Sequence, residues 1–340
     1  MKTDIPALIC NPRIVPLTAW ALACMAPGVA QSQTATSGVV PAYPSRAITV
    51  VVPFPPGGTS DVLPRMIAPL LSRSLGVPVI IDNRPGASGA IGAAIVAKAK
   101  PDGHTLLLAT PPILATNQWL YKDLAYSPEK DFATITNAAS TPNIIVVHPS
   151  IPAKNLKEFI ALAKSKPDEL SFASGGNGTT HHLCGELLKT SANIKMQHIP
   201  YKGVGPAHQD LRSGRVPIMC ENFSNAIPLV RAGTLRAIAL TGKTRHPQAM
   251  DIPTANESGL PGFEAGVWFG FVAPAGTPKA VIDRLNTEIG TALRANELGE
   301  RIAGLGLTII ADSPESFARF VTAESARWRE VIKVSGARAD

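Results

Sequence analysis

The sequence of 340 residues lacks the short motifs that mark many enzymes and cofactor-binding domains. It contains no GxSxG nucleophile elbow and no HExxH metal motif, and its seven histidines show no spacing typical of metal ligands. Gly178 is not followed by the Lys of a Walker P-loop, and residues 86–92 do not form the GxGxxG of a dinucleotide site. We therefore expect no cofactor, no metal and no enzymatic activity.

Charged residues are also few. They make up 17% of the chain, against 45% hydrophobic residues, a balance typical of a folded globular protein. No basic run is interleaved with aromatic residues, so the sequence gives no indication of nucleic-acid binding. The net charge of +7 favours encounter with anions, and the length leaves room for two domains.

A long apolar run occurs only near the N-terminus. Residues 14–29 follow Arg13 and lead into Gly28-Val29-Ala30, a small-x-small pattern typical of signal-peptide cleavage. We predict that residues 1–30 form a secretory signal and that residues 31–42, rich in Ser, Thr and Gln, form a disordered tail. An uncleaved membrane anchor is the alternative. A periplasmic protein is expected.

Cysteine is scarce as well. Of the four, Cys10 and Cys24 lie in or before the expected signal, where lipid attachment at Cys24 is a further alternative. Cys184 and Cys220 remain in the exported chain. We expect two buried, apolar thiols, and an oxidising compartment leaves a disulfide between them as the alternative.

A strand–glycine–helix segment points most directly to function. Residues 48–52 are a β-branched apolar run, which predicts a buried strand ended by Pro53. Gly57-Gly58 can adopt positive φ and let another group approach the backbone. Thr59, Ser60 and Asp61 are typical of helix starts, whose unpaired N–H groups attract anions. We interpret residues 54–61 as one side of an anion site, against the alternative of an ordinary strand–helix connection.

Strands and helices alternate regularly along the rest of the chain. This pattern predicts a doubly wound α/β fold with mainly parallel sheets. Two apolar strands closed by proline, at residues 144–149 and 269–274, resemble each other and suit two crossings between two lobes. We therefore predict a first lobe of residues 43–141 plus 269–340 and a second lobe of residues 142–268.

Two local expectations concern proline and strand length. The first helix is predicted over residues 61–75, and Pro69 should kink or shorten it. The strand that precedes His148 is predicted over residues 143–147 only.

A second glycine loop, residues 174–180, also follows a strand and opens a helix. Ligands of open α/β sheets bind beyond the carboxyl ends of strands. The two loops, one in each lobe, are therefore expected to face each other across a cleft and donate backbone N–H groups to one anionic ligand. Hydroxyl groups of Thr59, Thr179 and Thr180 add donors, and neither loop contains Lys or Arg.

Four side chains near these loops have two interpretations each. His182 is expected at the helix start or cleft edge rather than on a metal. Asp61 either caps a helix or contacts ligand. Glu221 either receives a ligand ammonium or is a solvated charge at a strand end. Trp268 either packs between the lobes or stacks on the ligand.

Many ordered motifs resemble one family, the Bug receptors, which are the extracytoplasmic solute-binding components of tripartite tricarboxylate transporters. The resemblance covers residues 43–336. It is carried by Tyr43-Pro44, Val51-Val52-Pro53-Phe54, Gly57-Gly58-Thr59-Ser60-Asp61, Asn83-Arg84-Pro85-Gly86-Ala87-Ser88-Gly89, Tyr121-Lys122-Asp123-Leu124, Asp131-Phe132, Ser174-Gly175-Gly176-Asn177-Gly178-Thr179-Thr180-His181-His182-Leu183, Pro200-Tyr201-Lys202-Gly203, Asp251-Ile252-Pro253-Thr254, Trp268-Phe269-Gly270 and Ala273-Pro274-Ala275-Gly276-Thr277-Pro278. Two departures are Pro55-Pro56, where the family usually has small residues, and Cys220-Glu221, where it usually has an aromatic residue and Asp.

The resemblance implies a two-lobed periplasmic-binding-protein type II fold, each lobe a mainly parallel sheet flanked by helices. It implies a monomeric receptor that holds a small carboxylate, largely through backbone groups and ordered waters, and delivers it to an integral-membrane permease. The candidate ligand-binding residues lie in or near the two loops: Phe54, Gly57, Gly58, Thr59, Asp61, Ser174, Gly176, Asn177, Gly178, Thr179, His182 and Glu221.

Two other functions remain open from the sequence. An exported hydrolase would need a nucleophile and a base in the cleft, and Ser174 with His182 is the nearby pair. A sensory receptor would use the same ligand site but dock onto a membrane kinase rather than a permease.

Overall fold

The computed structural model describes residues 43–339. The predicted signal at residues 1–30, the tail at residues 31–42 and lipid attachment at Cys24 lie outside the described residues. Within residues 43–339, no helix combines the length and the apolar character that a bilayer crossing requires.

The described strands join in one sheet, in the order β2-β1-β3-β9-β4-β7-β5-β6, and β8 and β10 both pair with β4. The strands are β1 (Ile48–Val52), β2 (Val79–Asn83), β3 (Thr105–Ala109), β4 (Phe132–Val147), β5 (Ser171–Ser174), β6 (Gln197–Pro200), β7 (Ile218–Asn222), β8 (Arg236–Leu240), β9 (Gly266–Pro274) and β10 (Thr308–Ile309).

The outer strands are parallel and the central strands antiparallel. β1 runs parallel to β2 and β3, and β5 runs parallel to β6 and β7. β4 and β9 are antiparallel neighbours whose pairing extends from Phe132↔Pro274 to Pro142↔Gly266. Beyond Pro142, β4 changes partners and pairs with β7 and β8. The predicted lobe boundaries near residues 141 and 268 remain a prediction.

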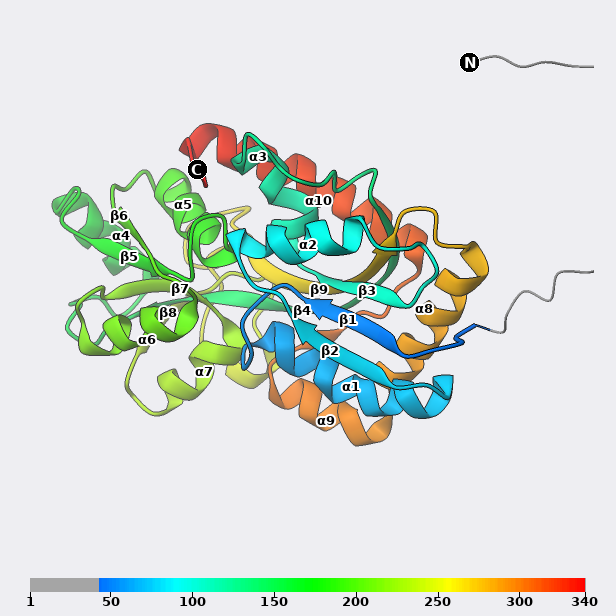
Figure 1. Cartoon of the computed structure of the whole chain (residues 1–340). Helices are drawn as coiled ribbons and strands as arrows, with labels where there is room; N and C mark the ends of the chain where they lie inside the picture. Colours follow the sequence, from blue (N-terminus) through cyan, green and yellow to red (C-terminus); the bar gives the residue numbers. More distant parts are fainter. Residues whose placement is uncertain (1–42, 340) are drawn as a thin grey trace, which may run out of the picture. The chain divides into compact units, whose positions relative to one another are not determined.

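Helices cover both faces of the sheet (Figure 1). They are α1 (Thr59–Leu75), α2 (Ala90–Ala97), α3 (Asn117–Leu120), α4 (Leu156–Ser165), α5 (Thr180–Ala192), α6 (Val204–Ser213), α7 (Phe223–Arg231), α8 (Lys279–Leu293), α9 (Asn296–Gly304) and α10 (Pro314–Ser335), with short turns η1 (Ala87–Gly89), η2 (Pro112–Thr116) and η3 (Pro247–Ala249).

The core follows from the two-residue alternation of the strands. Val50 and Val52 of β1 face the cluster that α1, α8 and α9 complete, whereas Val51 faces the cluster formed with α2 and α10. In the same way, Phe172 of β5 faces α5 and Ala173 faces α6. Burying each large apolar side chain contributes about 1.5–3 kcal/mol, so this two-faced burial fixes the strand register.

Two local expectations differ from the structure. The strand predicted over residues 143–147 begins eleven residues earlier, at Phe132, because the Thr- and Ala-rich first part of β4 carries no clear apolar alternation. The prediction that Pro69 would shorten the first helix is wrong, because α1 runs from Thr59 to Leu75. Pro69 and Arg65 are both exposed, so water can bond the carbonyl that Pro69 leaves without an N–H partner.

Candidate functional site

The first glycine loop leaves the start of α1 open. Gly57 has a φ of +94°, and Gly58 is the residue before the first helical position, with no side chain capping the helix. A Cβ added to either glycine would meet no atom within 4 Å. Because the first N–H groups of a helix have no partner within it, this end of α1 can donate to an anion.

Asp61 supports this loop from behind. It is 4% exposed, and its carboxylate accepts from the Gly57 N–H at 3.0 Å, from Arg65 Nε at 2.9 Å and from Asn83 Nδ2 at 2.9 Å. Burial raises the pKa of Asp61, but these hydrogen bonds and the Arg65 charge outweigh it and lower the pKa. The geometry gives Asp61 a positioning role, and its predicted ligand contact stays a prediction.

Asn83 is a further support that sequence reasoning missed. Its Nδ2 also donates to the Phe54 carbonyl at 3.0 Å, so one amide holds both ends of the loop. Phe54 itself is partly buried, whereas Pro55 and Pro56 are exposed. The loop therefore presents its proline and glycine residues outward.

The second glycine loop is held by its own polar side chains. Gly176 and Gly178 have positive φ, and the Thr179 hydroxyl donates to the Gly176 carbonyl at 2.7 Å. His182 Nδ1 accepts from the Gly178 N–H at 3.1 Å. Asn177 is exposed at the tip. His182 thus lies at the helix start, as predicted, and supports the loop.

The predicted Ser174–His182 pair is wrong as a pairing. The Ser174 hydroxyl lies 2.6 Å from His198 Nε2, and it also bonds the backbone of Gly176. Ser174 is 0% exposed. His198 was missed because it comes from β6, 24 positions away, and nothing local marks it as a partner.

Burial keeps both histidines of this loop neutral. His182 and His198 stack with ring centroids 3.9 Å apart. Burial, with a smaller contribution from Lys189, lowers the pKa of His182 to about 4. Burial, then His182 and Lys189, lowers the pKa of His198 to about 3. Neutral rings suit their use here as hydrogen-bond partners of Gly178 and Ser174.

Each glycine loop contacts an element that is distant from it in the sequence. The Thr59 hydroxyl lies 2.8 Å from the Ser224 hydroxyl at the start of α7. The Ser88 hydroxyl in η1 donates to the Asn177 carbonyl at the tip of the second loop. A Cβ on Gly178 would lie 3.0 Å from Leu120 and 3.5 Å from Ser88. A Cβ on Gly89 of η1 would lie 3.4 Å from the Phe54 ring, so η1 lies near both loops, with α7 beside the first and α3 beside the second.

Ser88, Asn117 and Ser224 belong to this region but were not predicted. Asn117 is 0% exposed and donates from Nδ2 to the Ser88 carbonyl at 3.3 Å. Asn143 and Asn222 are paired in the β4–β7 ladder, and both carry buried amide atoms that have no hydrogen-bond partner within residues 43–339. The signal that could have found Asn222 is its polar side chain at the carboxyl end of a buried strand.

Glu221 is not the solvated strand-end charge that was one of its two interpretations. It is 0% exposed and accepts from His181 Nε2 at 2.9 Å and from His208 Nε2 at 2.5 Å. Burial raises the pKa of Glu221, but the charges and hydrogen bonds of both histidines outweigh it and hold the pKa well below its usual range. Its carboxylate is thus engaged by protein groups, and contact with a ligand ammonium stays a prediction.

Two further expectations concern the cysteine pair and Trp268. Cys184 of α5 and Cys220 of β7 form a disulfide with a Cα–Cα distance of 6.0 Å, so the expectation of two free thiols is wrong. Trp268 is 3% exposed and packs edge-on against Phe317 and Phe320 of α10. Its packing partners are known, while stacking on a ligand stays a prediction.

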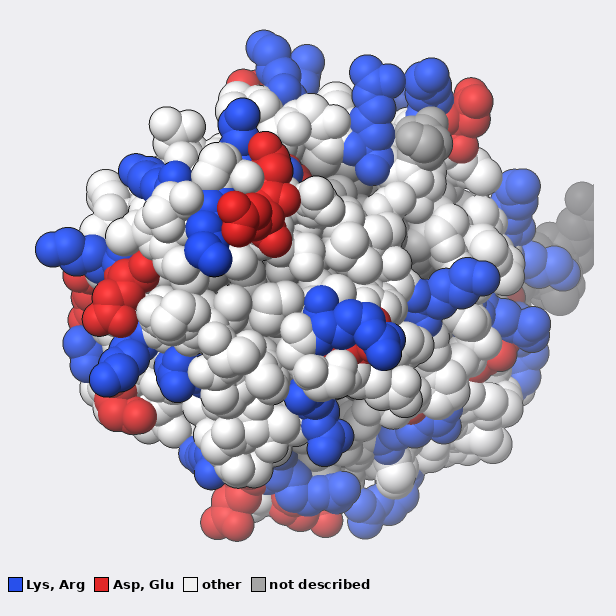
Figure 2. Space-filling model, turned by 90° about the vertical axis from the view of Figure 1, so that its left-hand side faces the viewer, with Lys and Arg blue, Asp and Glu red and all other residues white. Residues whose placement is uncertain are grey.

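Metal ligands and surface charges are the other features that could form an anion or metal site in residues 43–339. Residues 43–339 contain no group of three or more His, Cys, Asp or Glu side chains arranged to hold a metal ion. On the face shown in Figure 2, Lys and Arg side chains are scattered among acidic ones, with broad uncharged areas between them.

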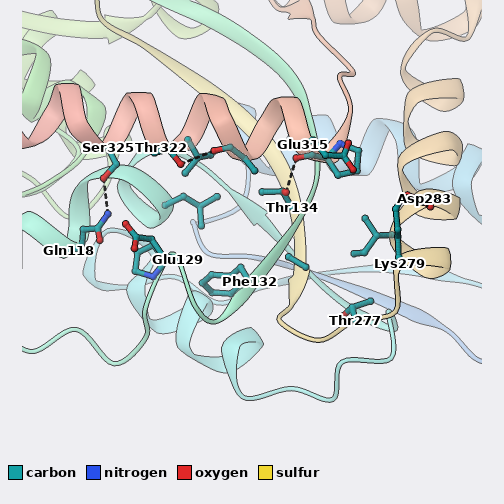
Figure 3. Close-up of a pocket in the computed structure, with 17 residues that line it drawn as sticks. Gln118, Glu129, Phe132, Thr134, Thr277, Lys279, Asp283, Glu315, Thr322 and Ser325 are labelled. Carbon is teal, nitrogen blue, oxygen red and sulfur yellow. Dashed lines mark hydrogen bonds and ion pairs between the residues drawn. The ribbon is translucent and has the colours of Figure 1, made fainter.

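A cavity of about 480 Å³ lies away from both loops, between α10, α8 and the start of β4 (Figure 3). Several of its polar side chains bond one another or the backbone. Gln118 donates to Ser325, Thr134 donates to the Pro314 carbonyl, and Lys279 pairs with Asp283. The start of α1 offers backbone N–H groups that no side chain caps. The loops are therefore a better candidate for a carboxylate site than this cavity.

Three solved structures resemble this chain closely. An R. palustris protein solved with adipate is 38% identical, with a TM-score of 0.82, covering 87% of this chain and 99% of that protein. MatC from Rhodopseudomonas palustris, with bound malate, is 35% identical, with a TM-score of 0.80, covering 85% and 100%. The periplasmic binding protein BugD is 36% identical, with a TM-score of 0.80, covering 87% and 99%.

These neighbours confirm the predicted α/β fold of a two-lobed periplasmic binding protein. Residues 63–337 match the family described as tripartite tricarboxylate transporter family receptor. Because that match spans most of the chain, the resemblance to Bug receptors is confirmed, and the chain belongs to the tripartite tricarboxylate transporter family receptors.

Proposed function

We propose that this protein is an exported, monomeric receptor that binds a small carboxylate between its two glycine loops in the periplasm and delivers it to an integral-membrane permease. The observation that carries the proposal is the uncapped start of α1, where no side chain covers Gly57 and Gly58. The Thr59–Ser224 contact brings α7 beside it, and the Ser88–Asn177 contact brings η1 to the second loop.

Backbone donors can supply useful affinity. A hydrogen bond to a charged group contributes about 1.5–3 kcal/mol net, so five or six contribute roughly 8–18 kcal/mol. Association costs roughly 4–15 kcal/mol. The net free energy of binding, which is the hydrogen-bond contribution less the cost of association, can reach about −8 kcal/mol without a buried Lys or Arg. This value corresponds to micromolar binding.

The ligands of the neighbours support a dicarboxylate. Adipate and malate, bound to the two R. palustris proteins, share two carboxylate groups and differ in chain length and in one hydroxyl group. One carboxylate would lie at the start of α1. The Asn143 amide and Asn222 Oδ1, which have no hydrogen-bond partner within residues 43–339, offer a donor and acceptors to the rest of the ligand.

A receptor fits the site better than a hydrolase. The Ser174 hydroxyl lies 2.6 Å from His198 Nε2, as a nucleophile lies beside a base, but Ser174 is 0% exposed and its hydroxyl also bonds the Gly176 backbone. Its oxygen is therefore enclosed by the protein and not presented to a ligand. Transport and sensing share the same ligand site. Capture of a permease rather than a kinase by the ligand-loaded protein from solubilised membranes would favour transport.

The test is calorimetry against di- and tricarboxylates, acidic amino acids and aromatic acids, with Gly58→Val as the key variant. Gly58 has a φ of −81°, and its Cβ position is free, so Val is tolerated by the protein but covers the helix start. We expect at least tenfold weaker binding. Gly299→Val, on α9 with equal free space, is the matched control and should bind normally. No binding of any acid by the unmodified protein, or turnover of one of them, would refute the proposal.

A further inference from the structure

A buried carboxylate lies where the second glycine loop begins. Glu221 is the next-to-last residue of β7, and β7 runs parallel to β5, whose last residue, Ser174, opens the loop. The carboxyl ends of β5 and β7 therefore share one edge of the sheet, the edge at which α/β proteins bind ligands.

Two histidines from opposite faces of the sheet meet at this carboxylate. His181 comes from α5, which packs with Phe172, and His208 comes from α6, which packs with Ala173. His181 Nε2 lies 2.9 Å from Oε1 and His208 Nε2 lies 2.5 Å from Oε2. The Asn222 N–H and the Asn225 amide complete the shell of Oε1. Each histidine thus points an Nε2–H at Glu221, and its Nδ1 faces away.

His181 Nδ1 is buried and lacks a hydrogen-bond partner within the described part of the chain. The residue is 6% exposed and is the second residue of α5. Nδ1 lies 3.5 Å from the position of a Cβ on Gly175, the first residue of the loop after β5. An unsatisfied buried polar atom costs about 1–3 kcal/mol, so a partner supplied by the ligand would recover that cost.

We propose that His181 contacts the ligand through Nδ1 and selects carboxylates that carry a hydrogen-bond donor, a hydroxyl or ammonium group, next to the acid. This inference rests on the proposed function of the same site. A neutral imidazole whose Nε2–H bonds Glu221 offers only an acceptor at Nδ1, and a carboxylate oxygen also only accepts. The two would repel, whereas a hydroxyl or ammonium group donates to Nδ1.

The neighbouring histidine, His208, can carry the positive charge that Glu221 needs. Burial lowers the pKa of His208, but its hydrogen bond to Glu221 and the charge of Glu221 outweigh burial and raise it. His208 therefore supplies the positive charge that balances Glu221, with Arg212 as the other cation that acts on it.

The test uses three matched pairs of acids that differ only by a hydroxyl group: malate and succinate, citrate and tricarballylate, and mandelate and phenylacetate. By calorimetry, the protein should bind the hydroxylated member of at least one pair about tenfold more tightly. His181→Gln keeps an amide N–H for Glu221 but removes Nδ1. It should reduce that preference to about twofold or less and leave the affinity for the other member nearly unchanged. His208→Gln, at the other histidine of Glu221, is the matched control and should keep the preference.

Nitrogen NMR of isotope-labelled histidine gives a second readout on the unmodified protein, independent of whether the variants fold. The Nδ1 resonance of His181 should shift with the hydroxylated acid and not with its partner. Absence of any hydroxyl preference, or a preference that survives in a folded His181→Gln, would overturn the inference. Tight binding of acids without such a preference would overturn only this inference, while failure to bind any carboxylate would overturn the proposed function as well.

Discussion

The two glycine loops have the same local plan but are supported by different chemistry. The first loop is held by a charged group, Asp61, with Arg65 and Asn83 around it. The second is held by neutral groups, the Ser174 hydroxyl and the rings of His182 and His198. The helix after the first loop carries no side-chain cap, whereas Thr179 Oγ1 accepts from the His182 N–H at 3.5 Å at the second.

The supports differ in how far they reach along the chain. Asp61 bonds residues four positions to either side and one residue of the adjacent β2. The second loop depends on His198 from β6 and on a disulfide that ties α5 to β7. We infer that the first loop forms from local interactions, whereas the second depends on tertiary contacts and is the more sensitive to redox state and pH.

The largest effect should follow from removing the disulfide. Cys184 and Cys220 are 36 residues apart, and closing a loop of that length stabilises a protein by about 4 kcal/mol in the chain-entropy treatment. Cys184→Ala combined with Cys220→Ala should therefore lower the free energy of unfolding by about 2–5 kcal/mol. Denaturant unfolding without reductant measures this loss.

Wild-type protein unfolded with a reductant serves as the control and should show a similar loss. The comparison of the loops would fail if the double variant were as stable as the wild type within about 1 kcal/mol, because α5 would then not depend on its covalent tie.

The first loop was predictable from sequence because its signals are local. A β-branched strand, Pro53, Gly57-Gly58 and Thr59 follow one another within twelve residues, and each carries its own conformational preference. The α/β alternation was predictable for the same reason. The first part of β4 was not, because its stability comes from pairing with β9 rather than from its own apolar pattern.

The supports of the second loop could not be predicted from local sequence. Ser174 is 24 positions from His198, and Glu221 is 40 positions from His181. Nothing in one segment specifies its partner in the other, because the fold alone brings them together. The adjacent His181 and His182 show this most clearly, since one bonds Glu221 and the other bonds Gly178.

The next effect should be a loss of stability in mild acid that originates at the second loop. The native pKa of His182 is about 4 and that of His198 about 3, below the ordinary value of 6.5. Both groups then take up protons on unfolding, and stability falls as the pH drops from about 6.5 towards 4. At about 1.4 kcal/mol per pKa unit, His182 alone accounts for about 3 kcal/mol. The pKa of Asp61 is lowered below its ordinary value of 3.8, so Asp61 stabilises the folded protein above pH 3.8 and loses this effect only below that pH.

Denaturant unfolding at neutral pH and at about pH 4.5 checks this difference. His198→Gln places an amide near the Ser174 hydroxyl and cannot titrate, so it should lose clearly less stability than the wild type over this range. His246, whose pKa burial also lowers, contributes equally to both proteins. Equal losses in the two proteins would show that the second loop is not the acid-sensitive one.

The smallest effect concerns the hydroxyl groups that connect each loop to a distant element. Thr59→Val removes the contact with Ser224, and Ser88→Ala removes the hydrogen bond to Asn177. Each neutral hydrogen bond contributes about 1 kcal/mol, so we expect each variant to bind the preferred acid about fivefold more weakly. Thr322→Val on α10, whose hydroxyl bonds only the Ala318 carbonyl, should bind normally. If both variants bind equally weakly, both loops contribute to ligand binding. If calorimetry shows that neither variant changes the affinity, these two hydrogen bonds do not contribute to binding.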